Sequence, residues 1–197
     1  MNALWIALAY FVGAIPTSYL AGRLRGIDLR EQGSKNLGAT NTYRVLGWRY
    51  AVPVALVDIA KGALPVALAR ATASPALPVL VGTAAVCGHM FSPYVGFKGG
   101  KGVATAGGMF LALAPVALAI SAGVWVAAVW LTGYVSVGSL LAAGLFPIWA
   151  ALTEHAPLTV WTSVPLAGVI LFTHRANIRR LLDGTEHRFR TGSGLAT

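Results

Sequence analysis

Six long apolar stretches that contain almost no charged residues constrain this sequence more than any other feature. They cover residues 2–21, 51–69, 77–91, 103–132, 135–153 and 158–172. Of the 197 residues, 56% are hydrophobic and only 11% are charged, whereas a soluble domain carries about 25% charged residues. Because a helix of about 20 apolar residues crosses the hydrocarbon core of a bilayer, the sequence predicts an all-α, polytopic membrane protein. The first stretch follows no basic segment, so we expect a retained transmembrane helix and not a cleaved signal peptide.

The fourth stretch decides the number of spans. It is too long for one ordinary span, and Pro115 lies near its middle, where a proline breaks or kinks a helix. Basic residues cluster between Arg23 and Arg49, at Lys98 and Lys101, and after His174. The positive-inside rule puts all three clusters in the cytoplasm only if the fourth stretch is split. We therefore predict seven transmembrane helices, with the N-terminus outside and the C-terminus cytoplasmic. The two halves are short for a bilayer, so tilted or partly re-entrant helices are expected there.

Composition excludes several classes of function. The single cysteine, Cys87, rules out an internal disulfide and a cysteine metal cluster. No HEXXH, CxxC or G-x-S-x-G motif and no paired-carboxylate site occurs, so we predict no metal and no cofactor. The net charge of +9 is explained mostly by membrane orientation, and the remainder could serve anionic lipid or a phosphorylated substrate but not nucleic acid. Without a long linker or a clear repeat, residues 1–197 are expected to form one domain.

The first polar cluster is GSKNLGATNTYRVLGW, residues 33–48. Short hydroxyl and amide side chains stand there among glycines beside one guanidinium, which suits the oxygens of an anion. Gly33 and Gly38 have the spacing of a nucleotide phosphate loop, but Ala39 replaces its lysine. The alternative is a plain polar cytoplasmic turn.

The second polar cluster is GHMFSPYVGFKGGKGVATAGG, residues 88–108. Its glycines permit backbone conformations and close approaches that a Cβ forbids, and successive N–H groups beside Lys101 could form a nest for an anion. A helix that begins near Val103 would also direct its N-terminus at the loop. Gly102 follows Lys101 where a nucleotide loop needs serine or threonine, so we exclude a nucleoside triphosphate site. A flexible turn with glycines that serve only helix packing is the alternative.

The third polar cluster is THRANIRRLLDGTEHRF, residues 173–189. His174 and Asn177 are three residues apart and share one face of a helix, which Asp183-Gly184 would end. The neighbouring arginines can serve simply as anchors at anionic headgroups. Asp58 and Lys61 have helical i,i+3 spacing inside the second stretch, and we interpret them first as an ion pair that orients the helix.

With these three clusters in place, the chain resembles the bacterial PlsY-type acyl-phosphate:glycerol-3-phosphate acyltransferases. The resemblance rests on GSKNLGATN, on GHMFSPY followed by GFKGGKGVAT, and on HRANIRRLLDGTEHRF, and it covers essentially the whole chain. It implies a seven-span protein of the bacterial inner membrane with its active site facing the cytoplasm. The H-x-x-x-x-D pair of soluble glycerophosphate acyltransferases is absent, because Tyr94 follows His89 and Arg179 follows His174 at that spacing. Lys35 stands where the family usually has glycine, and we assign it no role.

The resemblance implies that a fatty acyl group passes from acyl phosphate to the 1-hydroxyl of sn-glycerol 3-phosphate. The products are lysophosphatidic acid and inorganic phosphate, in the first step of phospholipid biosynthesis. The expected partners are these two substrates and membrane lipid, and we expect a monomer. Candidate catalytic residues are Ser34, Lys101, His174 and Asn177. Candidate substrate-binding residues are Asn36, Thr40, Asn41, Arg44, Gly99, Gly100, Gly102 and Ser139.

The role of His174 stays open at this stage between a general base and a binding group. No carboxylate is evident to orient it, and the phosphate of the substrate could take the proton instead. Two other classes of function compete with the enzyme. A small anion transporter would suit basic clusters and short broken helices, but it would have its site near the membrane midplane. A structural lipid-binding protein would not need asparagines and threonines in glycine-rich loops.

Overall fold

The computed structural model of the chain describes residues 2–154 and 156–189, and this part is helical with no β-strand. The chain divides into two compact units, one formed by the chain up to Pro115 and the other from Val116 onward, and each is described by itself. The all-α class predicted from the sequence is confirmed for the described residues. That residues 1–197 act as one domain stays a prediction.

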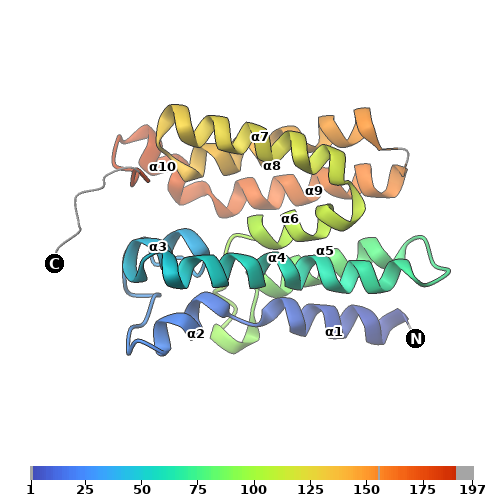
Figure 1. Ribbon diagram of the computed structural model, residues 1–197, viewed down its shortest axis with the longest axis horizontal. Helices are drawn as coiled ribbons and strands as arrows, with labels where there is room; N and C mark the ends of the chain where they lie inside the picture. The colour runs from blue at the N-terminus through green and yellow to red at the C-terminus, as the bar shows by residue number, and fades with distance from the viewer. Residues whose placement is uncertain (1, 155, 190–197) are drawn as a thin grey trace. The chain divides into compact units, whose positions relative to one another are not determined.

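Among the described residues of the first unit, five α-helices pack around a sixth, α4, Trp48–Arg70, which contacts each of them (Figure 1). Helices α1 and α5 lie along one another, and α6 packs against both α4 and α5. The bounds of the other helices are α1, Asn2–Ala14; α2, Thr17–Arg23; α3, Ala39–Leu46; α5, Leu77–Met90; and α6, Val103–Leu113. A short 3₁₀ turn, Pro93–Val95, follows α5.

In the second unit, the described residues form helices α7 to α10, of which α8, Val135–Thr153, packs along α9, Pro157–Thr173. Helix α7, Pro115–Thr132, begins at the boundary of the two units, and the indole N–H of its Trp125 donates to the Ser139 hydroxyl of α8. The amphipathic helix α10, Arg175–Leu182, follows α9 after a bend of 55°.

The predicted split of the fourth apolar stretch is confirmed. Ala114 leaves the helical region, with φ −146° and ψ 63°, and caps the C-terminus of α6. Pro115 is then the first residue of α7. Proline is favoured there because the first residue of a helix needs no N–H hydrogen bond and its φ is already helical.

The first apolar stretch differs from the single helix that the sequence predicts. The helix stops at Ala14 and resumes at Thr17, with Ile15 and Pro16 outside the helical conformation. Pro16 explains the break in part, because proline disfavours the helical region in the residue before it.

Among the described residues, four segments are long and apolar enough to cross a membrane, namely Asn2–Arg23, Trp48–Arg70, Pro115–Thr132 and Val135–Thr153. The bent pair of α9 and α10 raises this number to five if it counts as one span. Large apolar side chains such as Leu64, Trp130 and Trp161 are more than half exposed on these helices. Exposed apolar surface of this kind is what lipid, and not water, would cover.

Glycines bring the helices of the first unit into backbone contact. A Cβ on Gly62 of α4 would overlap the carbonyl oxygen of Thr105, and one on Gly108 of α6 would overlap that of Ile59. Close approach through small residues is the usual way in which helices associate in a bilayer. The packing interpretation of the second cluster's glycines therefore holds for Gly108, whereas a Cβ on Gly107 would meet open space.

These two neighbours on α6 allow a matched test of this packing. We expect Gly108→Ala to destabilise the protein by about 1–3 kcal/mol, because its methyl group must displace the α4 backbone. Gly107→Ala should leave stability unchanged or raise it by up to about 1 kcal/mol through helix propensity. Thermal unfolding of the two purified variants in detergent measures the difference, and equal midpoints would contradict close packing at Gly108.

Candidate active site

The loop of the first cluster is built around Asn41. This residue is buried in the first turn of α3, where its Oδ1 accepts a hydrogen bond from the backbone N–H of Ser34 at 2.8 Å. Its Nδ2 donates to the carbonyl oxygens of Leu29 at 3.2 Å and Gln32 at 3.1 Å. These bonds use both amide protons. Asn41 therefore stabilises the conformation of the loop. If Asn41 contacts substrate as predicted, the contact would use the second lone pair of Oδ1.

The other candidates of the first cluster surround this loop. Ser34, Asn36, Thr40 and Arg44 are all half-buried. Thr40 lies in the first turn of α3 and Arg44 in its last turn. Hydroxyl, amide and guanidinium groups of this kind can hydrogen-bond to the oxygens of an anion. Their substrate-binding role stays a prediction.

Lys35, to which the sequence analysis assigned no role, adopts an unusual backbone conformation. Lys35 has φ +60°, in the left-handed region that favours glycine. The neighbouring Gly33 also has a positive φ, of +59°. Lys35 therefore adopts the conformation that glycine, which the resemblance leads us to expect here, adopts most readily.

In the second cluster, Gly99 and Gly100 let the loop fold back on the end of α5. The Gly99 N–H donates to the Met90 carbonyl and the Gly100 N–H to the His89 carbonyl, each at 3.0 Å. A Cβ at Gly99 would overlap the His89 carbonyl oxygen, and one at Gly100 would overlap the His89 imidazole. The anion nest predicted from the sequence is therefore wrong for these two amides, because both already have backbone acceptors.

Lys101 and Gly102 lie where this loop meets α6. Gly102 has φ +86° and is the N-cap residue of α6, which begins at Val103 as the sequence predicts. Lys101 is half-buried directly before it. The helix N-terminus and the lysine place two sources of positive potential side by side, which favours an anion.

The first and second clusters meet in the first unit. Leu37 of the first cluster and Val95 of the second are buried together with Leu29 in one apolar core. The Leu37 carbonyl also lies so close to Gly100 that a Cβ there would contact it. Two loops that are about sixty residues apart in the sequence thus form one polar region.

In the third cluster, His174 lies at the bend between α9 and α10 and is buried. Its Nδ1 lies 2.8 Å from the carbonyl oxygen of Ile170, one turn earlier. A carbonyl only accepts, so Nδ1 carries the proton of the neutral ring and Nε2 carries the lone pair. A backbone carbonyl therefore helps to orient this imidazole.

Asn177 is held by Glu186, a residue that the sequence analysis missed. The Asn177 Nδ2 and the Ser136 hydroxyl donate to Glu186 Oε1 at 2.6 and 2.9 Å, and Arg180 Nε donates to Oε2 at 2.6 Å. Burial alone would raise the pKa of this carboxyl, but the three hydrogen bonds outweigh it and the pKa is lowered. The sequence did contain a signal that could have pointed to Glu186. Asp183-Gly184 ends the helix, and a chain that turns there brings the next residues back beside α10.

Ser139, the remaining candidate, is buried in the first turns of α8. Its hydroxyl donates to the Val135 carbonyl at 2.9 Å and accepts from Trp125 Nε1 at 3.3 Å. Bonding to its own helix is common for serine in membrane helices. Its predicted contact with glycerol 3-phosphate stays a prediction.

Comparison with known proteins assigns the chain to a family. A family model described as glycerol-3-phosphate acyltransferase matches residues 3–184, which include every candidate residue named above. The chain belongs to this family. Glycerol-3-phosphate acyltransferase of Desulfotalea psychrophila is 48% identical over 192 residues, covering 94% of this chain and 97% of the relative. That of Geobacter sulfurreducens is 44% identical over 186 residues, covering 93% and 95%.

Comparison with solved structures supports the same family assignment. The crystal structure of PlsY (YgiH), an integral membrane glycerol 3-phosphate acyltransferase, in its glycerol 3-phosphate form has a TM-score of 0.92 and 36% identity, with 95% of each chain covered. Its lysophosphatidic acid form has a TM-score of 0.88 and 34% identity, with 95% of this chain and 94% of that one covered. The recognition made from the three polar clusters is confirmed.

The Glu186 carboxylate makes the stability of this acyltransferase dependent on pH. Its folded-state pKa lies below the usual 4.5, so the unfolded chain binds a proton first as the pH falls. Glu186 thus stabilises the fold above about pH 4.5, and this contribution disappears at lower pH. We expect Glu186→Gln to lower the thermal midpoint at pH 7, with a gap to wild type that narrows as the pH falls through 4.5 toward the lowered pKa. A gap of constant size from pH 7 to pH 4 would contradict an ionised Glu186.

Proposed function

We propose that this acyltransferase moves a fatty acyl group from acyl phosphate to the 1-hydroxyl of sn-glycerol 3-phosphate, as the first step of phospholipid biosynthesis. The observation that carries the proposal is the likeness, over almost the whole chain, to PlsY structures described as glycerol 3-phosphate and lysophosphatidic acid forms. Those two molecules are the acceptor before acylation and the product after it. Acyl phosphate as the donor rests on the resemblance of the three polar clusters.

In this proposal, residues of the first unit bind phosphate. Lys101 and the N-terminus of α6 supply positive potential, and Arg44, Ser34, Asn36 and Thr40 supply hydrogen-bond donors. Gly99, Gly100 and Gly102 shape the loop that carries Lys101, and Asn41 shapes the loop that carries Ser34. Both substrates are phosphorylated, so cationic and hydrogen-bonding side chains match the chemistry better than a protein nucleophile would.

The acyl transfer itself needs a proton acceptor. The 1-hydroxyl oxygen attacks the carbonyl carbon, its proton passes to Nε2 of His174, and the bond from carbon to the phosphate oxygen breaks to release inorganic phosphate. The Ile170 carbonyl supports His174 as the base, because it holds the proton on Nδ1. Phosphate is already a good leaving group, so orientation and charge stabilisation supply the rest. Asn177 and Ser139 are proposed to bind the acceptor.

The membrane arrangement that we propose has seven spans, formed by α1 with α2 and by α4 to α9. The N-terminus lies outside and the C-terminus in the cytoplasm of a bacterial inner membrane, so that the three basic clusters share the cytoplasmic side. The short helix α6 would cross only with local thinning of the bilayer or as a re-entrant segment. We expect the active site to face the cytoplasm and the protein to act as a monomer.

The donor is tested with the purified protein in detergent. Palmitoyl phosphate and glycerol 3-phosphate together should release inorganic phosphate and form lysophosphatidic acid, and omission of either substrate should stop both. Palmitoyl-CoA serves as the comparison donor. Product formation from palmitoyl-CoA without turnover of palmitoyl phosphate would overturn the proposed donor but not the acyltransferase family.

The role of Lys101 is tested against a lysine three residues away. Lys101→Ala should lower kcat/KM by about 100-fold or more, because it removes the charge at the proposed phosphate position. Lys98→Ala should remain near wild type, because that side chain is exposed in the same loop. Both variants should unfold at the wild-type temperature. Near-normal activity of Lys101→Ala would refute phosphate binding by this loop.

His174 as the base predicts a change in pH dependence as well as in rate. His174→Gln should lower kcat by about 100-fold or more, and the acidic limb of the profile of kcat against pH should disappear. His187→Gln, which alters an exposed histidine of the same segment, is the control and should change neither. Persistence of the acidic limb in His174→Gln would assign the proton to the substrate phosphate instead.

A further inference from the structure

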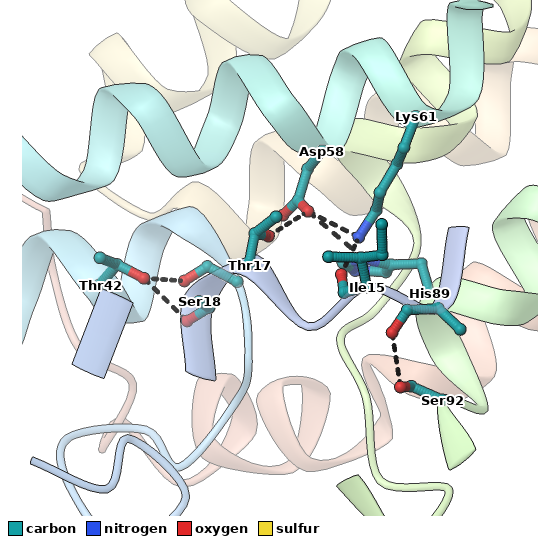
Figure 2. A network of polar contacts seen from close by, with 10 residues as sticks. Ile15, Thr17, Ser18, Thr42, Asp58, Lys61, His89 and Ser92 are labelled. Atoms are coloured by element: carbon teal, nitrogen blue, oxygen red, sulfur yellow. Dashed lines mark hydrogen bonds and ion pairs between the residues drawn. The ribbon is translucent and has the colours of Figure 1, made fainter. Parts of the chain in front are cut away.

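At the break in the first apolar segment, side chains from other segments donate to two backbone carbonyl groups. One of them, the Ile15 carbonyl, also accepts the backbone N–H of Thr17 at 3.0 Å. The Ala14 carbonyl accepts a hydrogen bond from the Ser92 hydroxyl at 2.6 Å, and the Ile15 carbonyl accepts one from Lys61 Nζ at 3.0 Å (Figure 2). A bilayer offers no water to such groups, so the protein itself must supply the donors. The ammonium also lies at the C-terminal end of α1, where the helix dipole favours a cation.

The carboxylate of Asp58 completes a buried network at this break. Asp58 Oδ1 lies 2.7 Å from Lys61 Nζ and accepts a hydrogen bond from the Thr17 hydroxyl at 2.6 Å. Both charged residues of α4 are almost fully buried. Buried charges are tolerated when they are paired and fully hydrogen-bonded, and Figure 2 shows both groups directed at the broken segment. The ion pair predicted from the i,i+3 spacing is confirmed, but its partners include the backbone of the break between α1 and α2.

One branch of this network leads to the first polar cluster. Thr17 begins α2, and the next residue, Ser18, shares a hydrogen bond of 2.8 Å with Thr42 of α3. The Thr42 hydroxyl in turn donates to the carbonyl of Gly38, the N-cap residue of α3, at 3.2 Å. Asp58 is thus connected, through α2, to the turn that carries Thr40 and Asn41.

A second branch leads to the glycine loop of the second cluster. His89 Nδ1 lies 3.7 Å from Asp58 Oδ1, and its ring lies directly under Gly100. The His89 carbonyl also accepts the Gly100 N–H at 3.0 Å. Lys101 follows Gly100, so the loop that carries this lysine packs on His89. That histidine lies beside Asp58 without a hydrogen bond, because 3.7 Å is too long for one.

We infer that Asp58 and Lys61 are positioning residues for phosphate binding, because their ion pair holds the break in the first span and through it both polar clusters of the first unit. This inference rests on the proposed function, since it names what supports the clusters proposed to bind phosphate. Neither residue touches the substrates. The competing explanation is that the pair only stabilises the fold, with no effect on how the folded protein binds its ligands.

The two explanations differ in what a folded variant does. We expect Asp58→Asn to remain folded, because an asparagine can still accept from Thr17, but to lack the charge that holds Lys61. Its KM for glycerol 3-phosphate should rise about tenfold or more while the protein stays monodisperse in detergent. The dissociation constant of inorganic phosphate, measured from the rise of the thermal midpoint with phosphate concentration, should weaken in parallel.

A milder set of variants keeps the inference testable if Asp58→Asn does not fold. Ser18→Ala removes one hydroxyl on the branch to α3 and should raise the KM for glycerol 3-phosphate about two- to fivefold. Thr83→Val is the matched control, because the Thr83 hydroxyl donates only to Val79 of its own helix at 2.8 Å and should leave KM unchanged. Equal KM values for wild type and Ser18→Ala would overturn the inference.

Exchange of the two charges separates positioning from simple pairing. The double variant Asp58→Lys with Lys61→Asp keeps an ion pair on α4, but an aspartate at position 61 cannot donate to the Ile15 carbonyl. We expect no recovery of phosphate affinity. Wild-type affinity and KM in this double variant would show that pairing alone suffices and would overturn the inference.

The outcomes for wild type distinguish this inference from the proposed function. If wild type shows neither turnover with palmitoyl phosphate nor stabilisation by phosphate, the proposed function fails and the inference fails with it. If wild type shows both, and folded Asp58→Asn keeps wild-type KM and phosphate affinity, only the inference fails. If wild type is stabilised by phosphate but uses another acyl donor, the proposed donor fails while weakened phosphate binding by Asp58→Asn still supports the inference.

Discussion

The structure depends on one constraint, which is that no backbone N–H or C=O group can be left without a partner inside a bilayer. Continuous helices meet this constraint by themselves, so most of the chain is helical. At the break at Ile15–Pro16, Lys61 of α4 and Ser92, which follows α5, donate hydrogen bonds to the carbonyl oxygens of Ile15 and Ala14. The Asp58–Lys61 ion pair is therefore explained by the backbone that it serves, and not only by the mutual neutralisation of two charges.

The loops of the candidate site obey the same constraint, and this leaves their side chains to meet ligands. Gly99 and Gly100 direct their N–H groups back to the end of α5, and Asn41 uses its amide on the backbone of its own loop. A phosphate site made of such a frame is cationic at its side chains and rigid at its backbone, which is what charge stabilisation in a transition state requires.

Much of the helical framework could be predicted because it is encoded locally. The stretch 135–153 coincides with α8, and Pro115 begins α7 as its restricted φ demands. The polar clusters were also evident, since glycines and lysines between apolar runs are distinctive. The nest at Gly99 and Gly100 was wrong because the sequence does not show that their N–H groups have acceptors on α5. Glu186 was missed because the groups that donate to it are not adjacent in the sequence. Ser136 of α8 is distant in the chain, and Asn177 of α10 lies across a turn.

The sequence by itself determined the all-α class, most of the apolar helices, the residues of the three polar clusters and, through those residues, the family. These properties follow from hydropathy, charge and local chemistry, which need no knowledge of what lies nearby in space. Only the tertiary structure decided which partner each polar group forms hydrogen bonds with. Ile170 orients His174, Glu186 holds Asn177, and the Asp58–Lys61 pair supports the broken first span. Such assignments depend on distances between residues remote in the sequence, and packing alone sets those distances.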